Sequence, residues 1–223
     1  AHCKAGQVKG ECSTNYLWDK NAPYLIKKNF HDVKLIICLR NPADRAYSHY
    51  WMRKSYIKSE KGSFEEAIAK DKSYLEAGYY YKHLKRYLKY FDRKQILVIW
   101  FEDIKNSPNI VLKSVLKFIG VNQTLSYNPR EKFHGAKTVR FKFVVSLMSL
   151  TSNFLINFGL SKVLHIAKKM GLKKAIMKLN MSPLKYPDMD PATRNLLRKK
   201  FKYDIKKLEI LLNFTLADRQ LLS

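Results

Sequence analysis

The stretch "LIICLRNPADRAYSHYWMRK", residues 35 to 54, decides the fold prediction. Val33 to Leu39 is a nearly unbroken apolar run of strand length, which is typical of a strand covered on both faces. Arg40 ends this run. Pro42 then suits the first turn of a helix, because proline lacks the N–H group that would be unpaired there. The stretch therefore predicts a buried strand that leads directly into a helix, with an arginine at the junction.

A second apolar run of strand length, "QILVIWF", occupies residues 95–101. Ser107 and Pro108 then open a further helix, and Gly120 closes it. The order strand, long helical crossover, strand, helix is typical of a parallel sheet flanked by helices. We therefore predict an α/β fold.

Local signals predict helices between and after the two strands. Ser63 and Glu66 form a capping-box pattern. Asp190 and Pro191 mark the start of the last helix as its cap and first turn. One apolar row recurs at helical spacing and consists of Tyr80, Leu84, Tyr87, Leu88 and Phe91.

From about residue 140 the chain is expected to be helical to its end. No internal repeat or low-complexity linker separates two parts of the sequence. We predict a single domain over residues 1–223, with a helical, basic segment at 140–185 inside it.

The charge balance is the unusual feature of the composition. Lys and Arg number 43 against 18 Asp and Glu, which leaves a net charge of +25. Such an excess lies mostly on the surface and attracts phosphate, sulfate, nucleic acid or anionic lipid. The three cysteines form no disulfide framework and no metal-binding spacing, which favours a reducing, cytoplasmic location. Cys38 is expected to be a small core residue.

Arg40 has the chemistry and the position of a residue that binds an anion. In open α/β sheets, ligands bind beyond the carboxyl ends of the strands, and a helix N-terminus favours an anion. Ser48 lies about 9 Å further along the helix axis, so it could share only an anion that lies along the flank of the helix. Alternatively, Arg40 pairs with Asp44 and Ser48 bonds to its own backbone. The spacing alone does not distinguish the two.

Residues 35–52 resemble the motif by which PAPS-dependent sulfotransferases hold the 3'-phosphate of 3'-phosphoadenosine 5'-phosphosulfate (PAPS). The resemblance is to the bacterial and heparan-sulfate-type branch. In that family the arginine that closes the strand and the serine of the next helix bind this phosphate, and they correspond to Arg40 and Ser48. Three further segments are similar to the family in the same order: residues 10–30, 78–108 and 186–212.

Residues 132–143, "KFHGAKTVRFKF", are similar to the basic loop of the family. Arg140 keeps the place of the family's arginine, whereas Gly135 and Val139 replace the usual Asn and Pro. The resemblance implies that Arg140, and with it Lys137, contacts the nucleotide. A solvated basic turn is the alternative.

The resemblance implies a fold related to P-loop kinases and the transfer of a sulfuryl group from PAPS to a hydroxyl or amine, with a carbohydrate as the expected acceptor. Adenosine 3',5'-bisphosphate would be the product, and no metal is expected. In the family, a loop of the type Pro-Lys-x-Gly-Thr wraps the 5'-phosphosulfate. The sequence contains no such loop. We therefore expect an N-terminally incomplete domain with little or no activity. No catalytic residue is assigned, although Glu102 and Asp103 follow the second strand.

Two other functions compete with this interpretation. The charge and the helices rich in Lys, Arg and Tyr would suit a nucleic-acid-binding module, but no known nucleic-acid-binding motif is present, and we expect no specific nucleic acid partner. Residues 140–180 mix apolar stretches with Lys, as do helices that lie on anionic membranes. The most apolar window, 143–160, contains Ser, Thr and Asn throughout, so no transmembrane segment is predicted.

Overall fold

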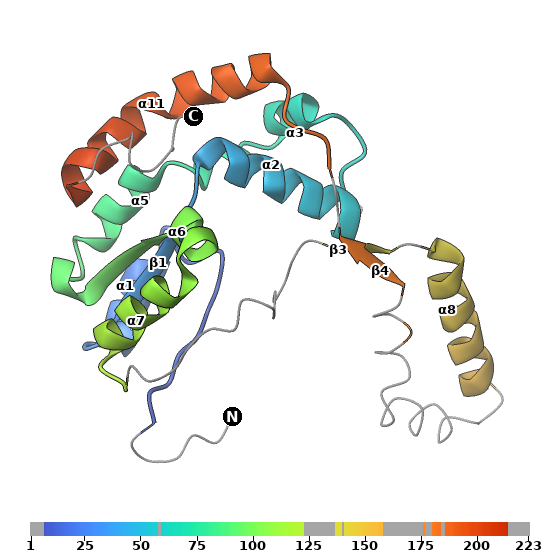
Figure 1. The fold of residues 1–223 in the computed structure, drawn as a ribbon, viewed down its shortest axis with the longest axis horizontal. Helices are drawn as coiled ribbons and strands as arrows, with labels where there is room; N and C mark the ends of the chain where they lie inside the picture. The colour runs from blue at the N-terminus through green and yellow to red at the C-terminus, as the bar shows by residue number, and fades with distance from the viewer. Residues whose placement is uncertain are drawn as a thin grey trace. The chain divides into compact units, whose positions relative to one another are not determined.

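The computed structural model divides into two compact units, and Figure 1 shows its helices and strands. The first unit comprises Ala1–Glu131 together with Asp188–Ser223, and the second comprises Lys132–Pro187. The basic segment predicted at 140–185 falls within the second unit. The residues that the structure describes are 7–57, 59–122, 137–139, 141–157, 176, 180–183 and 186–213.

Two parallel strands form the sheet of the first unit. Strand β1 (Leu35–Leu39) pairs with β2 (Ile96–Trp100), in a register that runs from Leu35 opposite Ile96 to Leu39 opposite Trp100. Both strands therefore end at the same edge of the sheet. The parallel pair with a helical crossover confirms the predicted α/β pattern.

Helices surround this pair in the order that the sequence predicts. The elements before and between the strands are α1 (Ala22–Asn29), α2 (Pro42–Met52), the π-helix η1 (Arg53–Ile57), α3 (Phe64–Lys70), α4 (Ser73–Glu76), α5 (Tyr80–Tyr87) and the 3₁₀ turn η2 (Arg93–Gln95). The elements after β2 are α6 (Phe101–Asn106), α7 (Pro108–Ile119) and α11 (Pro191–Leu212).

The predicted helix boundaries are confirmed where a cap defines them. The Ser63 hydroxyl accepts from the Glu66 N–H, and the Glu66 carboxylate accepts from the Ser63 N–H, which completes the capping box of α3. Gly120 ends α7 in the left-handed conformation at φ 82°, as expected for a C-terminal glycine. Helix α2 ends at Met52, and the chain continues from Arg53 as a π-helix.

The prediction that β1 is covered on both faces is wrong. Ile37 and Leu39 are buried on one face, but on the other face Ile36 is 42% exposed and Cys38 is exposed. At one end of this face, the Lys34 ammonium lies 5.8 Å from the Phe118 ring of α7. Cys38 is therefore not a core residue.

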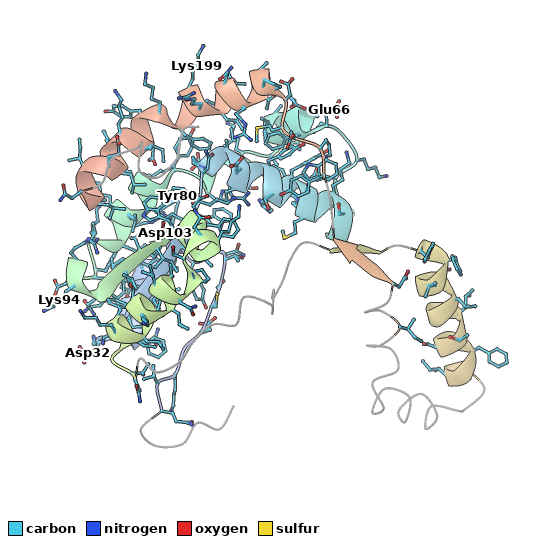
Figure 2. All side chains as sticks on the ribbon, viewed as in Figure 1. Asp32, Glu66, Tyr80, Lys94, Asp103 and Lys199 are labelled. Atoms are coloured by element: carbon cyan, nitrogen blue, oxygen red, sulfur yellow. The ribbon has the colours of Figure 1, made fainter. Side chains whose placement is uncertain are left out.

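Helix α11 supplies much of the core of the first unit. It packs against α5 and α2 in Figure 1, and its inner row of Leu197, Phe201, Ile205 and Leu208 is fully buried. The buried Asp204 carboxylate accepts from the backbone N–H groups of Tyr81 at 2.9 Å and Lys82 at 3.2 Å. One carboxylate thus satisfies two amides in the first turn of α5, which have no partner inside that helix. On the outside, Lys94 and Lys199 project away from this unit (Figure 2).

Gly78 lies where α5 begins and has no room for a side chain. A Cβ atom there would approach two ring carbons of Phe201 to 2.9 Å and the Pro42 side chain to 3.1 Å. We therefore expect Gly78→Ala to lower the free energy of unfolding by about 1–3 kcal/mol, the usual cost of overpacking. Urea denaturation measures this change. Gly10→Ala is the control, because nothing lies within 4 Å of its Cβ position. An equal loss in both variants would contradict the packing argument.

His83 of α5 is buried, and its two hydrogen bonds favour the neutral form of its imidazole ring. Its Nε2 lies 2.7 Å from the Glu76 carbonyl oxygen, which can only accept, and its Nδ1 lies 2.9 Å from the Arg86 guanidinium, which can only donate. Protonation at Nδ1 would place two donors face to face. Burial lowers the pKa of His83 below its ordinary value, and the charges of Arg86 and Lys82 add to this effect, against the opposing hydrogen bond to Glu76.

This lowered pKa predicts a loss of stability in acid. Below about pH 6.5 His83 becomes protonated in the unfolded chain, while in the folded chain it stays neutral to lower pH. The unfolded state therefore binds more protons, and the free energy of unfolding falls as the pH drops. We expect thermal unfolding midpoints at pH 7.5 and 5.5 to differ less in His83→Gln, since glutamine can also donate to Glu76 and accept from Arg86. His31→Gln, at an exposed histidine, should leave the parent's difference unchanged. An unaltered difference in His83→Gln would contradict this prediction.

The second unit contains a short antiparallel ladder and one described helix. Strand β3 (Lys137–Val139) pairs with β4 (Met181–Pro183), and α8 spans Lys142–Asn157. The buried Asn180 side chain holds Phe141 at the start of this helix. It accepts from the Phe141 N–H at 2.8 Å and donates to the Phe141 carbonyl at 2.9 Å. In the part of the chain that the structure describes, no helix combines the length and the apolar character needed to cross a membrane.

Candidate functional site

Arg40 follows β1 directly, at the carboxyl edge of the sheet. Because Leu39 pairs with Trp100, the next residues, Arg40 and Phe101, also lie beside one another. The guanidinium carbon of Arg40 lies 4.9 Å from the centre of the Phe101 ring. This is a cation–π contact, and it holds the positive charge at the end of the strands.

No carboxylate neutralises Arg40 among the described residues. Asp44, the partner in the alternative interpretation, instead pairs with Arg194 of α11 at 3.0 Å. Arg40 is half-buried and forms no ion pair with any residue that the structure describes. A permanently charged guanidinium group without a carboxylate partner is suited to bind an anionic ligand.

The backbone amides at the start of α2 are not available as the sequence suggests. The Asn41 side chain accepts from the Ala43 N–H at 3.0 Å and from the Asp44 N–H at 3.3 Å, and Pro42 has no N–H. The Arg45 N–H bonds to the Asn41 carbonyl at 2.9 Å. An anion at this site would therefore rest on side chains more than on the tip of the helix.

Ser48 lies two turns into α2 and is half-buried. The alternative bond from its hydroxyl to its own backbone is not formed in the described structure. The structure thus places Arg40 at the beginning of α2 and Ser48 further along the same helix. Both side chains are only partly covered, and neither has a polar protein partner among the described residues.

Aromatic packing fixes the position of α2. The Tyr47 and Phe64 ring centres are 5.0 Å apart, those of Tyr50 and Phe64 are 5.5 Å apart, and the Tyr50 hydroxyl donates to the Gly62 carbonyl at 2.7 Å. These contacts tie α2 to α3 and to the loop before it. The helix that carries Ser48 is therefore anchored to α3.

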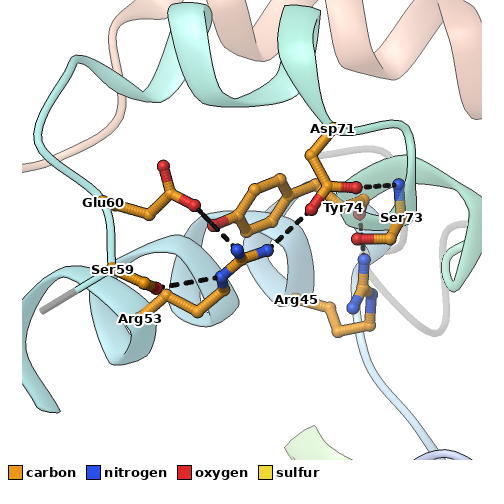
Figure 3. Close-up of polar contacts among 7 residues, drawn as sticks. All are labelled: Arg45, Arg53, Ser59, Glu60, Asp71, Ser73 and Tyr74. Carbon is orange, nitrogen blue, oxygen red and sulfur yellow. Dashed lines mark hydrogen bonds and ion pairs between the residues drawn. The ribbon is translucent and has the colours of Figure 1, made fainter. Parts of the chain in front are cut away.

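A polar network, shown in Figure 3, anchors the end of this helix. The Arg53 guanidinium bonds to Asp71 at 2.7 Å and to Glu60 at 3.1 Å, and it lies over the Tyr74 ring. The Tyr74 hydroxyl donates to Glu60 at 2.9 Å. Hydrogen bonds from Ser73 and Arg53 hold the pKa of Asp71 below its ordinary value. We interpret this network as structural, because both carboxylates are bonded to the same Arg53 guanidinium.

Arg45 and His49 lie on either side of Ser48 in the sequence of α2. The Arg45 guanidinium donates to the Tyr74 carbonyl, and burial lowers the pKa of Arg45. Burial, followed by the charges of Arg45 and Arg53, also lowers the pKa of His49. His49 therefore favours its neutral form beside Ser48, and the fixed positive charge near the serine comes from arginine.

Glu102 follows Phe101 at the same edge of the sheet. One of its carboxylate oxygens is buried without a hydrogen-bond partner, and the residue forms no ion pair among the described residues. Burial raises the pKa of the Cys38 thiol, and the charge of Glu102 raises it further, so the two residues are neighbours at the exposed face.

Of the predicted site residues, Arg140 lies outside the described residues. Lys137 begins β3 in the second unit. No group of His, Cys, Asp and Glu with the arrangement of a metal site occurs in the described ranges. Phe101 was missed by the sequence reasoning. The available signal was its place at the end of the second apolar run, whereas its position beside Arg40 depends on the strand register.

Comparisons with known proteins point to one protein family. A family model described as "Sulfotransferase domain" matches residues 20–148. The bifunctional heparan sulfate N-deacetylase/N-sulfotransferase 1 of Xenopus tropicalis is 31% identical over 142 residues, which are 55% of this chain and 16% of that protein. The human bifunctional heparan sulfate N-deacetylase/N-sulfotransferase 3 is 32% identical over 140 residues, or 57% of this chain and 16% of that protein.

A solved structure has a similar fold. The sulfotransferase from Alicyclobacillus acidocaldarius superposes with a TM-score of 0.61 at 23% identity, over 92% of this chain and 65% of that one. This likeness shows the predicted sulfotransferase fold. The chain spans 16% of the length of the two curated relatives above.

Proposed function

The chain belongs to the sulfotransferase domain family, and we propose that it binds PAPS through Arg40 and Ser48 and takes part in sulfation of a carbohydrate. The observation that carries this proposal is the Arg40 guanidinium, which is held over Phe101 at the carboxyl edge of the sheet without a carboxylate partner among the described residues.

The phosphate proposed for this position is the 3'-phosphate of the nucleotide. A guanidinium presents two parallel N–H donors that match two phosphate oxygens, and the Ser48 hydroxyl can donate to the third. The amides at the tip of α2 are already bonded to Asn41. A phosphate along the flank of α2 would therefore depend on these two side chains, with further positive charge from Arg45.

The reaction proposed is transfer of a sulfuryl group. The oxygen or nitrogen of the acceptor attacks sulfur, the bond from sulfur to the phosphate oxygen breaks, and adenosine 3',5'-bisphosphate leaves with the bonding electrons. The acceptor gives up one proton, which requires a base within hydrogen-bond reach. Arg140 is proposed to contact the nucleotide, as the resemblance implies. The described residues offer no metal site, and the proposed reaction uses no metal.

A carbohydrate acceptor is supported by the relatives and by charge. The matching relatives are named for heparan sulfate and for N-sulfation, so an amine or hydroxyl of an acidic glycan is the acceptor class to test. The net charge of +25 suits a polyanionic chain.

An assay with PAPS labelled in the sulfuryl group tests the proposal. Any transfer that occurs is expected to label heparan chains with free amines more than the same chains with acetylated amines. The expectation that these 223 residues transfer little or nothing stays a prediction, and the same assay tests it. Binding of adenosine 3',5'-bisphosphate without transfer would support the proposed nucleotide site but not the proposed sulfation of a carbohydrate. The absence of both binding and transfer would contradict the proposal.

A further inference from the structure

Helix α8 of the second unit carries a row of exposed apolar side chains. Phe143, Leu147, Leu150 and Phe154 are 67%, 57%, 63% and 58% exposed. Their spacing of four, three and four residues places them on one face of the helix. The row is about 16 Å long, at ~1.5 Å per residue. An exposed apolar face of this size on a helix indicates an interaction surface.

The charge of the same unit indicates what kind of surface it meets. Between Lys132 and Pro187 the sequence contains eleven Lys and Arg and not one Asp or Glu. The apolar row itself contains no charge, since residues 143–157 have neither acidic nor basic side chains. Positive charges lie just before α8 at Arg140, at its first residue Lys142, and after it from Lys162 onward. An apolar face within a uniformly basic segment matches the interface of an anionic membrane.

We propose that the second unit binds the surface of a membrane that contains anionic lipid, with α8 lying in the plane of the interface and Phe143, Leu147, Leu150 and Phe154 inserted. The described part of α8 does not have the character of a membrane-spanning helix, so it would lie on the bilayer. A polyanionic glycan or nucleic acid fits this surface less well, because four exposed apolar side chains add little to phosphate or sulfate binding. The proposal is independent of the nucleotide site.

Flotation of the whole 223-residue chain with vesicles tests the proposal. We expect binding to vesicles of phosphatidylcholine with 30% phosphatidylglycerol, and none to phosphatidylcholine alone. Leu147→Ser/Leu150→Ser should weaken binding about tenfold or more, because two inserted side chains lose their apolar character. Ile110→Ser is the matched control: Ile110 is 68% exposed on α7, in the first unit, and its replacement should change nothing.

A second measurement does not depend on how well the serine variant folds. Leu150→Trp keeps the apolar character of the row and adds a fluorescent probe. Its additional fluorescence should be quenched by brominated lipid in anionic vesicles, whereas that of Ile110→Trp should not. The proposal is wrong if the parent does not float with anionic vesicles. It is also wrong if heparin abolishes the parent's vesicle binding and Leu147→Ser/Leu150→Ser floats as well as the parent. A third contradicting result is a parent that forms a dimer, binds no vesicles, and becomes a monomer in this variant.

Discussion

Replacement of Phe201 by alanine is expected to lower the free energy of unfolding by about 3–5 kcal/mol, the usual cost of removing a buried phenylalanine ring. Phe201 is fully buried on the inner face of α11. Its ring centre lies 5.2 Å from that of Tyr79, and its edge lies against the backbone of Gly78. The close approach of ring and backbone leaves little freedom for the neighbours to fill the cavity.

Urea denaturation of the two proteins measures this effect, with Tyr203→Ala as the control. Tyr203 lies on the same helix and is 70% exposed, so its loss should change the free energy of unfolding by about 0.5 kcal/mol or less. If Phe201→Ala were as stable as Tyr203→Ala, α11 would not be part of the core that positions α2 and α5.

Replacement of Arg40 by alanine is expected to weaken the binding of adenosine 3',5'-bisphosphate by about 1.5–3 kcal/mol, the range for a hydrogen bond to a charged group. This corresponds to roughly 10- to 150-fold in affinity. Arg40→Lys should recover only part of the loss, because an ammonium keeps the charge but not the two-pronged geometry.

Isothermal titration calorimetry with the three proteins gives these affinities. Arg198→Ala is the matched control, since Arg198 is an exposed arginine on α11 and its loss removes the same charge at another place. The thermal unfolding midpoint of Arg40→Ala should remain close to that of the parent. A weakening of equal size in Arg198→Ala would mean that the nucleotide responds to net charge and not to Arg40.

The sequence predicts those parts of the fold that depend on local chemistry. Pro42 and Asp190 are found at the starts of α2 and α11 as expected, and Gly120 ends α7. These positions follow from which backbone groups lack partners at helix ends. The two apolar runs become parallel strands because each is short, unbroken and followed by a helix.

Contacts between distant segments could not be predicted in the same way. Asp44 has an arginine nearby in sequence at Arg40, yet it pairs with Arg194, 150 residues away. The exposure of Cys38 depends on which helices cover the sheet, and the apolar run alone does not contain that information. The Arg40–Phe101 contact required the strand register.

The predicted site residues remain predictions. Arg140 lies outside the described residues, and its proposed contact with the nucleotide rests on the resemblance of residues 132–143. For Arg40 and Ser48 the structure removes the alternatives, because the competing pair of Arg40 with Asp44 is not formed and Ser48 does not bond to its own backbone in the described structure.

The central claim is that Arg40 binds the 3'-phosphate, and a comparison of two nucleotides tests it most directly. Affinities of the parent and Arg40→Ala are measured for adenosine 3',5'-bisphosphate and for adenosine 5'-monophosphate, which lacks the 3'-phosphate. The account predicts that the parent prefers the bisphosphate at least tenfold and that Arg40→Ala removes this preference while binding the monophosphate as the parent does. The same preference in both proteins would contradict it.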